Sequence, residues 1–255
     1  MLWTRLSQDG VACHGLVEAG QVSLYEGDLF TTPRATGRVV PVQGAMLLPP
    51  LVPGKVVGLW NNFHALAAKN GSAIPDVPLY FIKATTSLLP SGGVIRPPPG
   101  YTGRVVYEGE LGIVIGRRCT NVDEDAAQAA IFGYTCINDV TALDWLTADL
   151  AFPQWARAKG CDTFGPVGPV IATGLDWRDL VIRVALNGRE RQNYPASDMI
   201  LPPARIVALL SREMTLEPGD LIACGTSVGV LPMRAGMEVT VTIDGIGTLT
   251  NTYAG

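Results

Sequence analysis

The segment VVYEGELGIVIG at residues 105–116 constrains the fold more than any other part of the chain. Its apolar residues predict a β-strand that runs into a protein core, yet Glu108 and Glu110 lie inside it with one glycine between them. Because side chains alternate across a strand, the two carboxylates are expected on one face, about 7 Å apart along the chain. A cation between them would let both ionise, whereas their repulsion without one favours protonation of one of them. The segment therefore predicts either a metal site or a solvated acidic pair at a sheet edge.

Patterns typical of β-strands outnumber helical patterns along the chain, and this predicts an α+β fold. Residues 1 to about 40 alternate short β-like runs with turns, which indicates a small all-β unit. Residues 41–55, PVQGAMLLPPLVPGK, carry four prolines and no regular period, so they are predicted to connect this unit to the main domain. We therefore expect a small β-rich N-terminal domain with its linker at residues 1–50 and a main domain at residues 51–255.

The main domain is predicted to combine strands with a few short helices. The helix at residues 61–71, NNFHALAAKNG, is expected to begin after an N-cap at Asn61 or Asn62 and to end at Gly71. The Asn-Gly pair inside LVIRVALNGRERQNY predicts a tight hairpin. Further helices are expected at 123–133, 140–150 and 204–214, and further strands at 55–60, 134–139, 220–225, 237–243 and 247–253.

Composition limits the partners and the location of the protein. Charged residues make up 16% of the chain, the formal net charge is −4, and lysine and arginine form no cluster, which argues against a nucleic-acid partner. No apolar run approaches the roughly 18 residues needed to span a bilayer, and the start, MLWTRLSQDG, lacks the apolar region of a signal peptide. We therefore expect a cytoplasmic protein without membrane contact. The five scattered cysteines argue against a disulfide framework and a structural zinc site.

Residues 225–229, GTSVG, match the G-x-S-x-G pattern of the α/β-hydrolase nucleophile elbow. That elbow needs a helix directly after its serine, but Pro232 and Gly236 follow within a few residues. It also needs a histidine later in the chain, and none follows His64. A catalytic triad in another chain order would have to use His14 or His64, so a serine hydrolase is disfavoured.

A metal site in this chain would be built mostly from oxygen ligands, because the sequence has two histidines and no paired cysteines. Oxygen ligands favour Mg²⁺, Mn²⁺ or Ca²⁺. Asp139, in YTCINDVTALD, supplies a third carboxylate where a predicted strand leads into a predicted helix. The alternative role for Asp139 at that position is a helix N-cap.

Six blocks of the sequence resemble the fumarylacetoacetate hydrolase family in their order and spacing, over residues 55–253. The resemblance implies a main domain built on the family's mixed β-sheet roll, and it implies the family's usual homodimer. It also implies that Glu108, Glu110 and Asp139 together bind one divalent ion. The blocks are VVYEGELGIVIGR, FGYTCINDVTALD, AKGCDTFGPVGP, LNGRERQ, TLEPGDLIACGTSVG and VTIDGIGTLTN.

The resemblance also assigns two residues to the substrate, Lys159 of the block AKGCDTFGP and Thr226 of the block that ends in GTSVG. The chemistry of a 2-oxo acid agrees with these residue types. Such an acid can chelate a divalent ion through its carboxylate and keto oxygens, so that the ion polarises the carbonyl. An enolate that forms there would be stabilised by the ion and by a nearby ammonium group, which is the role predicted for Lys159. The alternative for Lys159 is an ordinary surface lysine.

The first helix of the main domain departs from the family pattern. Many members read N-Y-x-x-H-x-x-E there, and the histidine and glutamate activate water. This chain reads WNNFHALA, which keeps His64 but has Ala67 in place of the glutamate. His64 could act alone as general base, because imidazole titrates near neutral pH, or it could be structural. Leu143 and Leu146 stand where relatives carry polar residues, which predicts a pocket for a less polar substrate tail.

We therefore expect an enzyme that uses Mg²⁺, Mn²⁺ or Ca²⁺ to cleave a C–C bond of a 2-oxo or β-diketo acid, by hydrolysis or decarboxylation, in the catabolism of aromatic compounds. The predicted catalytic residues are His64 and Lys159. The main alternative is an isomerase or decarboxylase of 2-hydroxy-dienedioates, because enolisation needs no water nucleophile and the partner glutamate is missing. If His64 and Lys159 are both structural, the chain would be a non-enzymatic, metal-stabilised binding protein.

Overall fold

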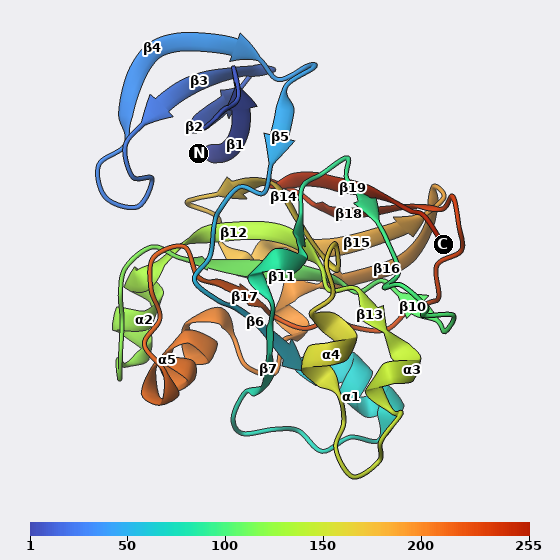
Figure 1. Cartoon of the computed structure of the whole chain (residues 1–255). Coiled ribbons are helices and arrows are strands. Elements are labelled where there is room, and N and C mark those ends of the chain that lie inside the picture. Colours follow the sequence, from blue (N-terminus) through green and yellow to red (C-terminus); the bar gives the residue numbers. More distant parts are fainter.

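The structure, a computed structural model, describes residues 1–255 and is built mainly from β-strands (Figure 1). Its largest sheet has twelve strands. Two strands lie off the main path of this sheet, where β5 (Met46–Leu48) pairs with β1 and β8 (Leu88–Leu89) pairs with β14. The main path runs in the order β4 (Arg34–Pro41), β3 (Gln21–Glu26), β2 (Val11–Glu18), β1 (Leu2–Gln8), β14 (Gly165–Ala172), β12 (Ile131–Asn138), β11 (Gly109–Ile115), β17 (Leu221–Ala223), β6 (Val56–Trp60) and β7 (Leu79–Lys83).

The remaining β-structure is a smaller sheet of five strands and a two-stranded ribbon. Short helices make up the other regular elements. The five strands are, in order, β16 (Arg189–Pro195), β15 (Val181–Leu186), β18 (Glu238–Ile243), β19 (Gly247–Tyr253) and β9 (Val94–Ile95), and the ribbon pairs β10 (Val105–Val106) with β13 (Thr141–Ala142). The α-helices are α1 (His64–Asn70), α2 (Glu124–Ala130), α3 (Leu143–Leu146), α4 (Trp155–Lys159) and α5 (Pro203–Glu213), and the 3₁₀ turns are η1 (Thr85–Ser87), η2 (Trp177–Asp179) and η3 (Ala196–Asp198).

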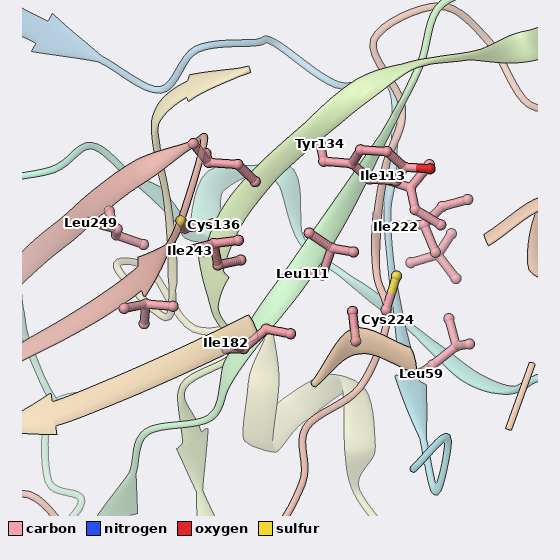
Figure 2. Close-up of a cluster of buried hydrophobic side chains, with 14 of the residues drawn as sticks. Leu59, Leu111, Ile113, Tyr134, Cys136, Ile182, Ile222, Cys224, Ile243 and Leu249 are labelled. Atoms are coloured by element: carbon pink, nitrogen blue, oxygen red, sulfur yellow. The ribbon is translucent and has the colours of Figure 1, made fainter. Parts of the chain in front are cut away.

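The main core joins the two sheets. Leu111 and Ile113 of β11 belong to the same buried cluster as Ile182 of β15 and Ile243 of β18 (Figure 2). The next residue of β11, Val114, belongs to a second buried cluster. Strand alternation therefore directs the odd-numbered positions of β11 into the main core and leaves the even-numbered positions on the other face.

The N-terminal strands extend the large sheet. They lie at one end of the molecule, drawn in blue in Figure 1. β1 pairs with β14 through Leu2 with Ala172 and Trp3 with Ile171. The proline-rich segment that was expected to be an irregular connector contains β5, because its residues 46–48 pair with β1.

The α+β fold predicted from the sequence is confirmed, as are the helix at α5 and the hairpin between β15 and β16. Asn187 and Gly188 at the hairpin turn have positive φ angles of 50° and 73°, the conformation that an Asn-Gly pair favours. No helix in the structure has the length and apolar character needed to cross a membrane.

The predicted cap of the helix at residues 61–71 is wrong at one end. The helix begins after Phe63, which makes no side-chain cap, and it ends at Gly71 with φ of 63° as predicted. Asn61 and Asn62 are both buried, and their amide groups bond instead to backbone carbonyls of Ala73, Leu201 and Cys224. Tertiary contacts therefore take the asparagines away from the helix end.

Other predicted elements are shorter than expected. The helix predicted at residues 123–133 ends at Ala130, because residues 131–133 begin strand β12. The helix predicted at residues 140–150 is reduced to α3, because residues 141–142 pair with β10 as strand β13. Its N-cap is Ala142, so the alternative role of Asp139 as a helix N-cap is wrong. The strand predicted at residues 105–116 is divided into β10 and β11, and Glu108 lies in the break between them.

Candidate active site

Three carboxylates meet where β11 begins and β12 ends, because these antiparallel strands pair Gly109 with Asn138. Asp139 directly follows β12, and its backbone N–H donates to the Glu108 carbonyl at 2.8 Å. Carboxylate oxygens of Glu108, Glu110 and Asp139 lie within 4.8 Å of one another. Glu110 and Asp139 are buried, and Glu108 is partly exposed. The strand pairing thus brings together the three carboxylates that the sequence singled out.

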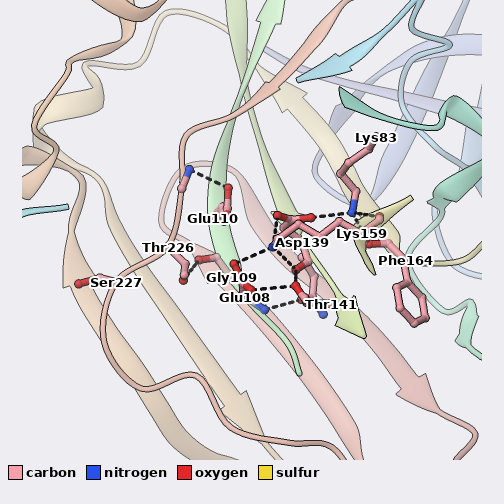
Figure 3. A network of polar contacts seen from close by, with 12 residues as sticks. Lys83, Glu108, Gly109, Glu110, Asp139, Thr141, Lys159, Phe164, Thr226 and Ser227 are labelled. Carbon is pink, nitrogen blue, oxygen red and sulfur yellow. Dashed lines mark hydrogen bonds and ion pairs between the residues drawn. The ribbon is translucent and has the colours of Figure 1, made fainter. Parts of the chain in front are cut away.

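Two buried lysines lie against these carboxylates (Figure 3). Lys159, the last residue of α4, places its Nζ 2.5 Å from Asp139 Oδ2 and 3.0 Å from Glu108 Oε2. Lys83, the last residue of β7, donates to Asp139 Oδ1 at 2.6 Å and to the Phe164 carbonyl at 3.1 Å. It also donates to the carbonyl of Lys159. Lys159 is therefore a fixed part of the carboxylate cluster, and the alternative of a surface lysine is wrong.

These charges shift one another's pKa values in different directions. Burial, together with the charges of Asp139 and Glu108, raises the pKa of Glu110 well above its usual value. Burial would also raise the pKa of Asp139, but the ammonium groups of Lys159 and Lys83 outweigh it and hold this pKa below its usual value. Burial opposes the charge of Lys159, yet Asp139 and Glu108 outweigh burial and raise the pKa of Lys159. Lys159 therefore keeps its positive charge at neutral pH.

The cluster fits a hard divalent cation. Glu110 Oε2 accepts from the backbone N–H of Gly225 at 2.8 Å, but Glu110 Oε1 is buried without a hydrogen-bond partner. A buried oxygen without a partner is costly, and a neighbouring cation would remove that cost. The available ligand atoms are all carboxylate oxygens, which suit Mg²⁺, Mn²⁺ or Ca²⁺. Glu108, Glu110 and Asp139 could together hold one such ion.

Thr226 is fixed beside the carboxylates by a buried glutamine. Its Oγ1 donates to the Gly109 carbonyl at 3.0 Å and accepts from Gln192 Nε2 at 2.9 Å. Gln192 Oε1 in turn accepts from the Gly109 N–H at 3.1 Å. Gly225 adopts a φ of 91°, which residues with side chains rarely reach, and directs its N–H at Glu110. These bonds tie the loop after β17 to the start of β11.

A cavity of about 200 Å³ opens beside this cluster. Glu108 and Lys159 are its charged lining residues, and most of the remaining wall is apolar. Leu143 and Leu146 lie on that wall, where the sequence predicted contact with a less polar tail. The lining residues are Leu59, Trp60, Asn61, Leu66, Phe81, Glu108, Thr141, Leu143, Leu146, Trp155, Lys159, Thr226 and Val230.

Two family models match consecutive parts of the chain. The model described as "Fumarylacetoacetate (FAA) hydrolase C-terminal" matches residues 55–254, and the model described as "Rv2993c-like, N-terminal" matches residues 1–50. The chain belongs to the fumarylacetoacetate hydrolase family. The resemblance seen in the six sequence blocks is thereby confirmed, and so is the predicted sheet-dominated fold.

Three members of the fumarylacetoacetate hydrolase family illustrate the similarity. Protein Rv2993c of Mycobacterium tuberculosis is 44% identical over 225 residues, which cover 87% of this chain and 83% of that protein. The crystal structure of 2-hydroxyhepta-2,4-diene-1,7-dioate isomerase from Mycobacterium marinum superposes with a TM-score of 0.91 at 39% identity, and covers 100% of this chain and 98% of that chain. Oxaloacetate tautomerase YisK of Bacillus subtilis is 36% identical over 208 residues, 77% of this chain and 68% of that protein.

The histidine of the family's H-x-x-E pattern lies apart from the cluster. His64 is exposed at the first position of α1 and does not line the cavity, whereas Leu66 does. Ala67, which stands where many members of the fumarylacetoacetate hydrolase family carry glutamate, is fully buried. The structure does not bring His64 together with Lys159, and its catalytic role stays a prediction.

Sequence reasoning missed two residues of this site, Lys83 and Gln192. Lys83 ends the apolar strand LYFIK, and a single lysine at such a position is a signal for a buried charge with a partner. Gln192 lies in the block LNGRERQ, which carried the family resemblance without a role for the glutamine. No helix follows Ser227 before β18, so the segment GTSVG does not have the strand–turn–helix geometry of a nucleophile elbow.

Proposed function

We propose that this chain catalyses enolisation of a 2-oxo acid, as an isomerase or tautomerase that depends on a divalent metal ion. The observation that carries the proposal is the ammonium group of Lys159, held between Glu108 and Asp139 on the cavity wall. Enolisation breaks a C–H bond beside the carbonyl: the electron pair moves toward the carbonyl oxygen, where negative charge develops, and the proton passes to a water molecule in the cavity. A fixed cation beside that oxygen stabilises such a charge.

Each residue of the cluster has a defined part in this proposal. Lys159 Nζ holds its protons next to the substrate position and donates a hydrogen bond to the developing oxyanion. Lys83 binds Asp139 and the carbonyl of Lys159, and so keeps the ammonium of Lys159 in place. Glu108, Glu110 and Asp139 would hold the ion, whose contribution is Lewis-acid polarisation of the carbonyl.

Enolisation fits this chain better than C–C bond cleavage, which the sequence placed first. The names of the Mycobacterium marinum and Bacillus subtilis relatives describe an isomerase and a tautomerase. Both reactions need an enol or enolate but no water nucleophile. The exposed position of His64, away from the cavity, also favours a reaction without activated water.

Hydrogen–deuterium exchange tests this proposal. Oxaloacetate, 2-oxo-4-phenylbutanoate and a seven-carbon 2-oxo-enoate would be incubated with the protein and Mg²⁺ or Mn²⁺ in deuterated water, and loss of the C3 protons followed by NMR. We expect the C3 protons of at least one of these acids to exchange much faster with the protein than without it. A chelator should stop the exchange. Cleavage fragments or CO₂ that form faster than deuterium enters would instead support the lyase or hydrolase expected from the sequence.

Three variants make the test specific to this site. Lys159→Met should lower the exchange rate by roughly 10²-fold, the scale of losing one preorganised charge. Arg157→Met is the control, because Arg157 lies on the same helix but does not line the cavity. Mg²⁺ should raise the melting temperature of the native protein and of Arg157→Met, but not that of Glu110→Gln. Exchange that survives both the chelator and Lys159→Met would refute the proposal.

Three further expectations accompany this proposal. A role in the catabolism of aromatic compounds follows from the resemblance to the family. A homodimer follows from the family resemblance, and light scattering of the purified protein would test it. A cytoplasmic location follows from the composition of the chain.

A further inference from the structure

A second, apolar hollow adjoins the cavity beside the charged cluster. This hollow has a volume of about 380 Å³ and is lined by Trp60, Leu79, Tyr80, Phe81 and Trp155. Three of its aromatic residues, Trp60, Phe81 and Trp155, also line the cavity beside the carboxylates. A ligand whose head lies at Lys159 therefore meets Phe81 and Trp155 inside the cavity, next to a further apolar surface on β6 and β7.

The aromatic rings form a stepwise path away from the head-group position. Lys159 Nζ lies 5.2 Å from the centre of the Phe81 ring. The Phe81 ring is stacked on Trp155 with centres 5.6 Å apart and planes at 17°, and Trp155 lies 5.9 Å from Trp60. Gly58 makes room for this arrangement, since a Cβ there would come within 2.4 Å of the Phe81 ring. The first ring of this path, that of Phe81, therefore lies next to the charged cluster.

Lys159 is the only cation among the residues that line the two hollows, and it lies at the head-group end, in the cavity beside the carboxylates. Its ammonium group is paired with Glu108 and Asp139. Arg157 lies two residues earlier on α4, so its side chain leaves the helix on a different side from Trp155 and Lys159. Its guanidinium group lies 4.3 Å from the centre of the Trp145 ring, outside both hollows.

Arg104, near α3, is likewise engaged elsewhere. Its guanidinium group is bonded to Asp144 at 2.7 Å, and Arg104 lines neither hollow. A second carboxylate on a substrate would therefore find no free cation beside the aromatic wall, and contact with that wall would cost it part of its hydration.

We propose that the substrate is a 2-oxo acid whose far end is an uncharged, flat apolar group, such as an aryl or alkenyl tail, that packs on Phe81 and Trp155. This inference rests on the proposed function for the head of the substrate. It separates the chain from the relatives named for dicarboxylates, 2-hydroxyhepta-2,4-diene-1,7-dioate and oxaloacetate. Aromatic stacking and burial of the tail replace the ion pair that a second carboxylate would need.

A matched pair of acids tests the inference. 2-Oxo-4-phenylbutanoate and 2-oxoadipate share the 2-oxo acid head and differ in the far end, a phenyl ring or a carboxylate. Binding would be measured by quenching of tryptophan fluorescence with Mg²⁺ present, and turnover by exchange of the C3 protons. We expect the phenyl acid to be preferred by at least about tenfold in both Kd and kcat/KM. A preference for 2-oxoadipate would overturn the inference.

Variants of residues in the apolar wall should change the preference between the two acids in a predictable direction. Trp155→Ala should weaken binding of the phenyl acid by about tenfold and leave binding of 2-oxoadipate nearly unchanged. Leu146→Arg, which puts a cation on the wall, should shift the preference toward 2-oxoadipate. Arg157→Leu is the control and should not change the ratio of the Kd values of the two acids. A ratio that depends on Arg157 would mean that this residue reaches the ligand, and it would overturn the inference.

The binding measurement separates this inference from the proposed function. If neither acid exchanges its C3 protons but the phenyl acid still binds more tightly, the enolisation proposal fails and the tail specificity stands. If both acids exchange and 2-oxoadipate is preferred, enolisation stands and the apolar tail is refuted.

Discussion

A single buried lysine decides how the charged cluster is held together. The side chain of Lys83 is fully buried, and its ammonium group reaches Asp139 and two backbone carbonyls. Burial lowers the pKa of Lys83, and the negative charge of Asp139 opposes this shift. Lys83 touches neither hollow, so it acts on the substrate through Asp139 and Lys159. It is therefore a positioning residue.

Replacing Lys83 by methionine should be strongly destabilising. The change removes one partner of a buried ion pair and leaves Asp139 with Lys159 as its sole ammonium partner, so we expect a loss of about 3–5 kcal/mol in the free energy of unfolding. Urea denaturation would measure it. Arg118→Met is the control, because its ion pair with Glu217 is largely exposed and should contribute less than about 1 kcal/mol. Equal effects of the two variants would contradict the assigned role of Lys83.

Helix α1 shows how one turn of a short helix can divide exposed from buried positions. His64 and Ala68 are exposed on it, and Ala67 is fully buried. The H-x-x-E pattern of many family members has a glutamate at the position of Ala67, where it pairs with the histidine. In the structure His64 and Ala67 lie in different environments, so a glutamate introduced at position 67 would not share the exposed face of His64.

Ala67→Glu should damage the fold without raising hydrolysis. A carboxylate at this fully buried position has no partner, and we expect a loss of several kcal/mol in the free energy of unfolding. Ala68→Glu is the matched control, because it puts the same side chain one helical turn from His64 on the exposed face and should change stability by less than about 0.5 kcal/mol. Thermal unfolding of both variants would measure the difference. A stable Ala67→Glu variant with new hydrolytic activity would restore His64 as the water-activating base.

At the scale of the whole molecule, the N-terminal strands share both a sheet and a core with the rest of the chain. β1 pairs with β14, and Trp3 belongs to a buried cluster with Val114, Ile137 and Ile171. The two parts of the chain match separate family models. Because the core is shared, we expect the two parts to unfold together.

We therefore expect a single cooperative unfolding transition in calorimetry. Trp3→Ala should lower the melting temperature of that whole transition, with a loss of about 3–5 kcal/mol in the free energy of unfolding, because it empties a buried site between the two parts. Val39→Ala, at an exposed position of β4, is the control and should have little effect. Two separate transitions, with only the first sensitive to Trp3→Ala, would show that the N-terminal strands unfold independently.

The sequence by itself determined the features that depend on short spacing. The Glu-x-Glu spacing brought two carboxylates to one site, Glu110 in β11 and Glu108 directly before it, and the Asn-Gly pair placed the hairpin turn. Such features are set by a few neighbouring residues. The helix predicted at residues 204–214 is likewise present as α5. The family blocks added Asp139, Lys159 and Thr226 to the candidate site through resemblance.

Only the tertiary structure decided how these pieces combine. Lys83 reaches Asp139 across 56 positions of the chain, and no local pattern encodes that contact. Pairing of β13 with β10 shortened the helix predicted at residues 140–150, because burial and strand hydrogen bonds outweighed local helix propensity. The apolar path from Lys159 to Trp60 likewise exists only where β6, β7 and α4 come together. These features depend on burial by residues that lie far apart in the sequence. Local spacing sets only the alternation of side chains along an element and the position of a turn.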